Sequence, residues 1–237
     1  MRPIGFSTGA LALSDFRGAL EQMQGRAVNS VELSALRIAE LRPMLEALHT
    51  LDLCQYRHIA VHAPSRFDAA QELEIARLLR AYVPEDWPIV LHPDTIHDFG
   101  VWAEFGQQMA IENMDRRKPI GRTVEELSTL FDALPDARLC FDIGHARQCD
   151  TTMTEAYRIL TRYADRLTWM HVSEVNTLSH HETLSFAATS AFEEVAYLIP
   201  KSVPVILEAR IAADEMDAEI AKARRALPLK AVASLIA

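Results

Sequence analysis

Short apolar runs recur along the whole chain and alternate with longer amphipathic segments. Each run is almost free of polar alternation, which is typical of strands buried on both faces of a parallel sheet. The runs are spaced as strand–helix units are. They predict strands over Pro3–Ser7, Val28–Leu33, His58–His62, Pro88–His92, Gln108–Glu112, Arg138–Asp142, Leu167–His171 and Pro204–Glu208.

The intervening segments carry the start and stop signals of helices. Ser14 precedes a periodic apolar stretch that Gly25 ends, as an N-cap and a C′ glycine do. Thr123 and Glu126 have the spacing of a capping box. The remaining helices are expected over Ser34–Leu48, Glu72–Tyr82, Thr95–Gly106, Thr154–Tyr163, Ala191–Ile199 and Asp214–Leu227.

This alternation predicts an α/β protein with the (β/α)8 TIM barrel fold and a single domain over residues 1–237. A doubly wound sheet with fewer strands is the alternative. The first predicted strand is followed by Thr8-Gly9-Ala10, which is too short to be a glycine-rich phosphate-binding loop. We therefore expect no nucleotide cofactor.

The composition narrows the class of protein further. Of 237 residues, 49% are hydrophobic and 24% are charged, which excludes a disordered chain. No apolar run approaches the roughly 20 residues that cross a bilayer, and the first residues show no signal-peptide pattern. Three cysteines do not make a disulfide framework, and Cys140, inside a predicted strand, is expected to pack in the core. These features predict a cytoplasmic protein that does not act at a membrane.

The predicted strands end in ionisable residues, which buried strands rarely contain. In a parallel barrel the carboxyl ends of all strands meet at one rim. Buried carboxylates and imidazoles that meet there need a compensating cation, and they are ligands that Zn²⁺ or Mn²⁺ accepts. The sequence therefore predicts a divalent metal site at the mouth. The strand-end residues are Glu32, His62, His92, Glu112, Asp142, His171 and Glu208, with His145 three positions after Asp142.

Six short motifs in this order resemble the xylose isomerase-like TIM barrels, which include sugar isomerases and epimerases and the type-IV apurinic endonucleases. The resemblance covers essentially the whole chain. The motifs are Val61-His62-Ala63-Pro64, Leu91-His92-Pro93, Ile111-Glu112-Asn113, Phe141-Asp142-Ile143-Gly144-His145-Ala146, Met170-His171-Val172 and Ile206-Leu207-Glu208.

The resemblance implies that Glu112, Asp142, His171 and Glu208 bind one divalent ion, which would be Mn²⁺, Mg²⁺, Co²⁺ or Zn²⁺. In the epimerase branch, Glu112 and Glu208 would also exchange a proton with a substrate carbon through a metal-stabilised enediolate. His145 would contact the substrate or the metal. This branch implies a metal-dependent isomerase or epimerase of a small sugar-like substrate. Superfamily members often pair, so a homo-oligomer is compatible with the sequence.

The endonuclease branch implies a different chemistry, that of a zinc-dependent hydrolase or phosphodiesterase. His62, His92, His145 and His181 would then be further zinc ligands. His181 lies in Ser179-His180-His181-Glu182, where Ser179 occupies the position of the carboxylate in the resembling loop, and His180 stays open as the ligand instead. Another metal-dependent reaction, such as that of a lyase, is a third possibility.

The charge distribution favours a small substrate over nucleic acid. The formal net charge is −9, whereas nucleic-acid affinity needs clustered positive charge. The basic run Arg116-Arg117-Lys118 follows Glu112 closely, and Arg116 is the candidate there for binding a phosphate or carboxylate on a small substrate, as is Arg210 after Glu208. Trp102 is the candidate for stacking on a sugar ring, and Trp169 is expected to face the helices.

Overall fold

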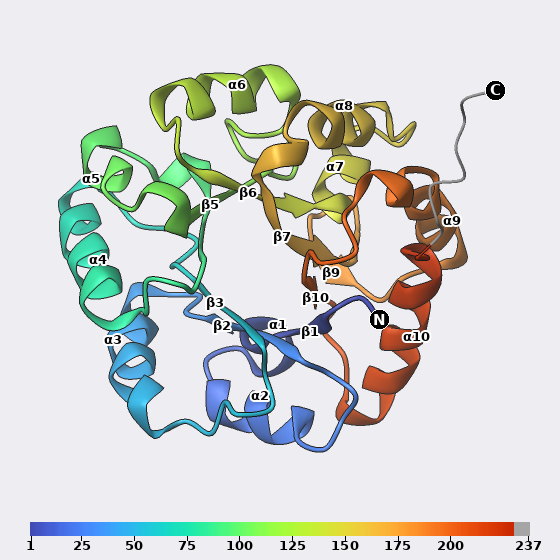
Figure 1. The fold of residues 1–237 in the computed structure, drawn as a ribbon, viewed down its shortest axis with the longest axis horizontal. Helices are drawn as coiled ribbons and strands as arrows, with labels where there is room; N and C mark the ends of the chain where they lie inside the picture. Colours follow the sequence, from blue (N-terminus) through green and yellow to red (C-terminus); the bar gives the residue numbers. More distant parts are fainter. Residues whose placement is uncertain (230–237) are drawn as a thin grey trace.

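The computed structural model describes residues 1–229, and its central feature is a closed barrel of parallel strands. The barrel runs in the order β1-β10-β7-β6-β5-β4-β3-β2, so the first and last strands pair and close it. Figure 1 looks down this barrel, with the helices as an outer ring. The TIM barrel prediction is confirmed; residues 230–237 of the predicted domain lie outside the described residues. The barrel strands are β1 (Ile4–Ser7), β2 (Ser30–Ser34), β3 (His58–His62), β4 (Ile89–Leu91), β5 (Met109–Glu112), β6 (Arg138–Asp142), β7 (Leu167–Val172) and β10 (Val205–Leu207).

The outer ring contains one principal helix after each barrel strand (Figure 1). These helices are α2 (Phe16–Met23), α3 (Ile38–Ala47), α4 (Ala69–Tyr82), α5 (Phe99–Ala103), α6 (Val124–Ala133), α8 (Thr154–Arg162), α9 (Phe186–Val195) and α10 (Met216–Ala226). Three elements at the carboxyl ends of the strands were not predicted. They are α1 (Thr8–Ala12), α7 (Ile143–Cys149) and a hairpin of β8 (Glu174–Val175) with β9 (His181–Glu182).

Local hydrogen bonds modify two predicted helix starts. Asp15, and not Ser14, caps α2, because its Oδ1 accepts from the Gly18 amide at 2.9 Å. Thr123 caps α6 as predicted, accepting from the Glu126 amide at 3.3 Å. The Glu126 carboxylate, however, accepts from the backbone amide of Arg122 at 2.7 Å, so the reciprocal half of the capping box falls one residue earlier.

The barrel interior contains a separate apolar layer. Cys140 lies in it, fully buried as predicted. The prediction that Trp169 faces the helices is wrong, because Trp169 belongs to this layer. Residues two apart in a strand share a face, so Trp169 points to the same side as His171. The layer consists of Ala60, Val90, Ala110, Cys140, Trp169 and Ile206.

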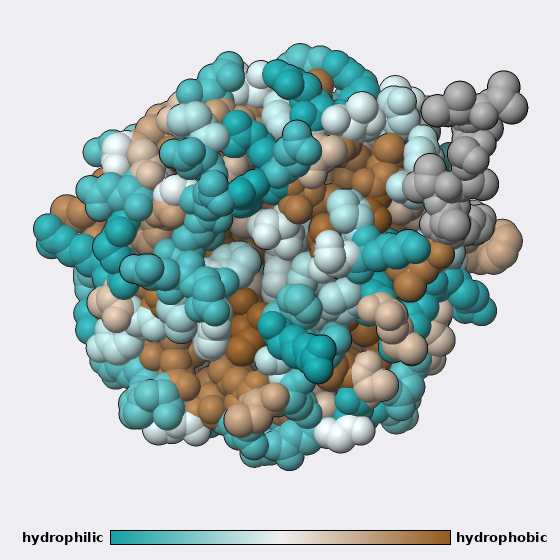
Figure 2. Space-filling model, in the orientation of Figure 1, coloured by the Kyte–Doolittle hydropathy of each residue, from teal (hydrophilic) through white to brown (hydrophobic). Residues whose placement is uncertain are grey.

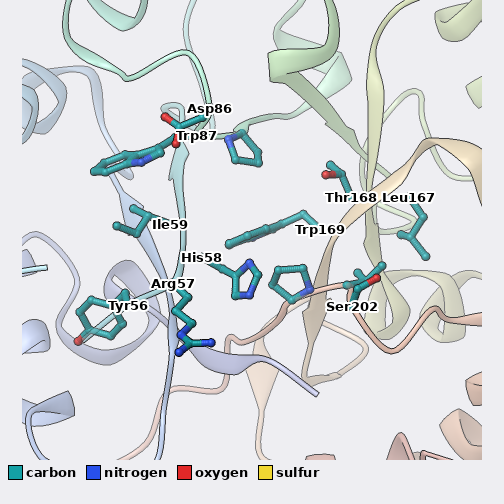
Figure 3. A pocket seen from close by; sticks show the side chains of 13 residues that line it. Tyr56, Arg57, His58, Ile59, Asp86, Trp87, Leu167, Thr168, Trp169 and Ser202 are labelled. Atoms are coloured by element: carbon teal, nitrogen blue, oxygen red, sulfur yellow. The ribbon is translucent and has the colours of Figure 1, made fainter. Parts of the chain in front are cut away.

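A cavity of about 550 Å³ lies at the amino ends of the strands, on one side of this layer. His58 points into it, the Trp169 ring lies across it, and Trp87 lines its edge (Figure 3). Figure 2 shows the face of the molecule that is seen in Figure 1. Hydrophilic side chains cover much of this face, with apolar side chains between them. None of the helices within residues 1–229 combines the length and the apolar character that crossing a membrane requires.

Candidate metal centre

A second cavity, of about 530 Å³, lies at the carboxyl ends of the strands. Strand-end and loop residues form its wall, so this cavity is the mouth predicted from the sequence. The structure brings all eight predicted ligands together in three overlapping groups, and within each group the ligand atoms lie within 4.8 Å of one another. The groups are Glu112–Asp142–His171–Glu208, His62–His92–Glu112 and Asp142–His145–His181.

The four-residue group is supplied by neighbouring strands, since β5, β6, β7 and β10 are consecutive around the barrel. Asp142 shows how the group is set for a cation. Its Oδ1 accepts from the His145 amide at 2.7 Å and caps α7, whereas its Oδ2 is buried without a hydrogen-bond partner. An unpartnered buried carboxylate oxygen costs free energy that a bound cation would recover. With three carboxylates and one imidazole, the group fits a divalent ion.

His171 is oriented by a carboxylate behind it. Its Nε2 donates to Glu32 Oε2 at 2.8 Å, and Trp169 Nε1 donates to the same oxygen at 2.9 Å. The other nitrogen, Nδ1, lies 3.2 Å from Glu112 Oε1 and 3.4 Å from Glu208 Oε2. A ligating histidine commonly donates its second N–H to a carboxylate, which fixes the tautomer and the ring orientation. Glu32 therefore orients His171 so that Nδ1 faces Glu112 and Glu208.

Glu32 is a residue that the sequence pattern placed among the strand-end residues but to which the resemblance gave no role. It is fully buried in the middle of β2, where it pairs with Ala60, two positions before His62 on β3. A carboxylate inside a buried strand was the available signal. It does not itself distinguish a ligand from a residue that orients one, because only the contact with His171 makes that distinction.

Glu112 is the electrostatic centre of the mouth. Its carboxylate lies 3.1–3.3 Å from ring nitrogens of four histidines. Burial alone would raise the pKa of Glu112, but the charge of His171 and the hydrogen bonds with the histidines outweigh it, and the pKa lies well below its ordinary value. The four histidines are His62, His92, His145 and His171.

Three of these histidines are stabilised in their charged form. Neighbouring acidic groups outweigh burial at His171 and hold its pKa well above its ordinary value. Burial opposes protonation of His62, but its hydrogen bond with Glu112 and the charge of Glu32 raise its pKa to about 9. Burial is likewise outweighed at His145, where Asp142 and Glu112 raise the pKa to about 10. The mouth without a metal therefore compensates its carboxylates with protonated imidazoles, which a bound cation would replace.

Two further ligand candidates, Glu208 and His181, are instead stabilised in their neutral forms. Burial raises the pKa of Glu208 to about 8, although the charge of His171 opposes the shift. Burial and the charge of His145 lower the pKa of His181 to about 3. His181 Nδ1 lies 2.8 Å from Ser173 Oγ. The structure places His181, and not His180, in a group of metal donors.

Ser179 takes part in the hairpin and not in a metal group. Its hydroxyl donates to Asp115 Oδ1 at 2.6 Å and accepts from Gln148 Nε2 at 2.8 Å. Asp115 is buried, so the carboxylate in this region is the hydrogen-bond partner of the serine and does not belong to the hairpin. The hairpin therefore contributes an imidazole to the mouth, while its serine holds the hairpin against the β5 loop.

The predicted substrate-binding residues are divided by the structure. Arg210 and His145 line the cavity, but Trp102 and Arg116 do not. Trp102 is buried beside α4, where its Nε1 donates to Glu72 Oε1 at 2.7 Å, so the prediction that it stacks on a substrate is wrong. Arg116 is replaced at the cavity wall by its two neighbours in the basic run, Arg117 and Lys118.

The fold and the site together define a TIM barrel with a candidate metal centre at the carboxyl ends of its strands. The chain belongs to the xylose isomerase-like TIM barrel family, whose model matches residues 25–226. No functionally curated protein matches the sequence closely enough to count as a relative.

Solved structures with the same fold differ widely in what they are named for. The IOLI protein with a bound zinc atom is 12% identical, with a TM-score of 0.62 over 96% of this chain and 98% of that one. Endonuclease IV from Thermus thermophilus is 18% identical, with a TM-score of 0.60 over 96% and 99%. D-allulose 3-epimerase from Methylomonas sp., in complex with D-allulose, is 16% identical, with a TM-score of 0.56 over 93% and 89%. At these identities the likeness establishes the shared fold.

Proposed function

We propose that the chain is a divalent-metal-dependent isomerase or epimerase of a small sugar-like substrate. The observation that carries this proposal is the Glu112–Asp142–His171–Glu208 group, which puts two carboxylates of potential acid–base function beside one cation site. The group lies at a cavity of about 530 Å³, a size that suits a small polar ligand. A cytoplasmic location fits such a substrate.

The proposed roles follow from the positions of the side chains. A bound divalent ion would polarise a carbonyl and stabilise the negative charge that develops when a neighbouring carbon loses its proton. Glu112 and Glu208 come from the outermost of four consecutive strands, so they can reach a substrate carbon from two sides. One would remove the carbon-bound proton and the other would return it. Arg210 would hold polar groups at the rim.

The test is exchange of substrate C–H for solvent deuterium, measured by NMR over a panel of ketoses with Mn²⁺, Mg²⁺, Co²⁺ or Zn²⁺ added. Glu112→Gln and Glu208→Gln should each lower the exchange rate by about 10²-fold or more, the usual contribution of a general base. Glu104→Gln is the matched control, because Glu104 is an exposed glutamate that pairs with Arg80. Turnover of a ketose without any exchange would contradict the mechanism.

Hydrolysis of a phosphodiester is the second candidate, and one observation favours it. The two additional donor groups share Glu112 and Asp142 with the first, so the cavity offers donors for more than one ion. Zinc-dependent cleavage of bis(p-nitrophenyl) phosphate, lost in both His62→Gln and His181→Gln, would support this function. Cleavage that survives both substitutions would not.

A further inference from the structure

Two histidines of the mouth differ in what their second ring nitrogen faces. His171 directs Nδ1 to the ligand group and donates Nε2–H to Glu32 at 2.8 Å. His92 has Nε2 at 3.1 Å from Glu112 Oε2, but its Nδ1 lies 3.4 Å from Lys118 Nζ. The outer nitrogen of His171 faces a carboxylate, which can only accept a hydrogen bond. The outer nitrogen of His92 faces an ammonium group, which can only donate one.

This difference determines which nitrogen can ligate. A neutral imidazole that accepts a hydrogen bond at Nδ1 carries its proton on Nε2. His92 Nε2 then donates to Glu112 and has no lone pair for a metal ion. His171 has the opposite arrangement. Its Nε2 keeps a proton that Glu32 accepts, so Nδ1 is the nitrogen that can give up its proton and ligate, as ligating histidines commonly do.

Lys118 is held firmly in this position. Its Nζ donates to both carboxylate oxygens of Asp94, at 2.9 and 2.7 Å, and the Lys118 and Asp94 side chains are 16% and 17% exposed. Asp94 follows β4 and Lys118 follows β5, so the pair joins two adjacent loops across the cavity wall. The ammonium group therefore stays against His92 with little further loss of side-chain freedom.

We infer that Lys118 closes the His62–His92–Glu112 group to a metal ion by keeping His92 as a hydrogen-bond donor to Glu112. Without His92, the group retains two donors, fewer than the three protein ligands that a catalytic zinc site uses. The inference rests on the proposed metal centre, because it states which donors that centre leaves out. Lys118 acts as a positioning residue that sets how many ions the mouth holds.

The test is the number of zinc ions per chain, measured by mass spectrometry after equilibration in a zinc buffer and checked by calorimetric titration. Lys118→Met should bind one ion more than the wild-type chain, since His92 can then turn its proton to Nδ1 and ligate through Nε2. His92→Gln alone should leave the wild-type number unchanged. The double variant Lys118→Met/His92→Gln should return to the wild-type number.

Two control variants test whether the effect depends on a hydrogen-bond donor at position 118 and not on any positive charge near the cavity. Lys118→Arg keeps a group that only donates, so it should keep the wild-type number of ions. Arg117→Gln removes a neighbouring cation that lines the cavity but bonds to Asp115 and to the Ser179 carbonyl, so it should also change nothing. A Lys118→Met variant that binds no additional ion, or a His92→Gln variant that loses one, overturns the inference.

A second measurement does not depend on the variants folding. Long-range ¹H–¹⁵N spectra of the metal-free wild-type chain should show His92 as the Nε2–H tautomer, and an Nδ1–H tautomer overturns the inference. The proposed centre fails in a distinguishable way. If the wild-type chain binds no ion at all, the metal centre itself is wrong, whereas the isomerase chemistry is tested separately by deuterium exchange.

Discussion

The two ends of this barrel enclose cavities of nearly equal volume, about 530 Å³ at the mouth and about 550 Å³ at the amino ends of the strands. Their chemistry differs. Among residues 1–229, all three metal-donor groups lie at the mouth, and their side chains are mostly buried. At the amino end the charged residues Arg57 and Asp86 are exposed to solvent. Volume therefore does not mark the functional end; buried charges that must be compensated do.

The same strands build both ends. Each of six residues at the mouth has an apolar residue two positions earlier, and these apolar residues form the interior layer that separates the cavities. Trp169 links the two ends of the barrel. It lines the amino-end cavity, and its Nε1 donates to Glu32, which also bonds to His171 at the mouth. An apolar layer beneath the mouth lowers the local dielectric constant and strengthens the interactions above it. The pairs are Ala60 with His62, Val90 with His92, Ala110 with Glu112, Cys140 with Asp142, Trp169 with His171 and Ile206 with Glu208.

The largest difference between the ends is expected from removing one carboxylate at each. In metal-free protein, Glu112→Gln should lower the free energy of unfolding by about 3 kcal/mol or more, because buried histidines lose their common counter-charge. Asp86→Asn should change it by less than about 0.5 kcal/mol, as surface substitutions usually do. Urea denaturation in EDTA measures both. Equal effects would break the comparison.

The strand positions and the mouth residues were predictable because one rule fixes both. Apolar runs mark the strands, and residues at their carboxyl ends must meet once the barrel closes. The alternation of side chains along a strand gave information that the prediction about Trp169 did not use. Trp169 and His171 are two apart, so placing His171 inside required Trp169 inside as well.

Contacts between loops were not predictable. Lys118 and Asp94 lie 24 positions apart, Asp94 in a 3-10 turn after β4 and Lys118 in the loop after β5, and their pairing depends on how these two connections fold back. The segment around Trp102 is equally irregular and forms only the five-residue helix α5. Neither segment has the periodicity from which a side chain can be placed.

A smaller and more specific effect is expected from the carboxylate behind the metal centre. Glu32→Gln should weaken divalent-metal affinity by about 10–100-fold, because His171 loses the acceptor that orients it. Glu219→Gln is the matched control. Glu219 is also buried and bonds to a backbone amide, that of Leu184 at 2.8 Å, but it lies outside the donor groups. Competition with a fluorescent chelator measures both affinities.

The outcome separates two roles of buried carboxylates in this fold. If Glu219→Gln weakened metal binding as much as Glu32→Gln, the loss would come from general loosening of the barrel. Loss of affinity in Glu32→Gln alone, with the free energies of unfolding of the two variants lowered to a similar extent, would assign Glu32 to the orientation of His171.

The smallest effect is expected at the amino-end cavity, where His58 tests whether that end is only structural. Burial and the charge of Arg57 lower the pKa of His58. The unfolded chain therefore binds a proton at higher pH than the folded one, and this contribution to stability is present above about pH 6.5 and is lost as the pH falls. His58→Gln should match wild type within about 0.5 kcal/mol at pH 8 and become relatively more stable at lower pH. Urea denaturation between pH 8 and 5, read as the difference between the two chains, measures this effect.

The number of bound ions should not change in His58→Gln, because His58 lies outside the donor groups. A lost ion in His58→Gln would show that the amino end contributes to the centre.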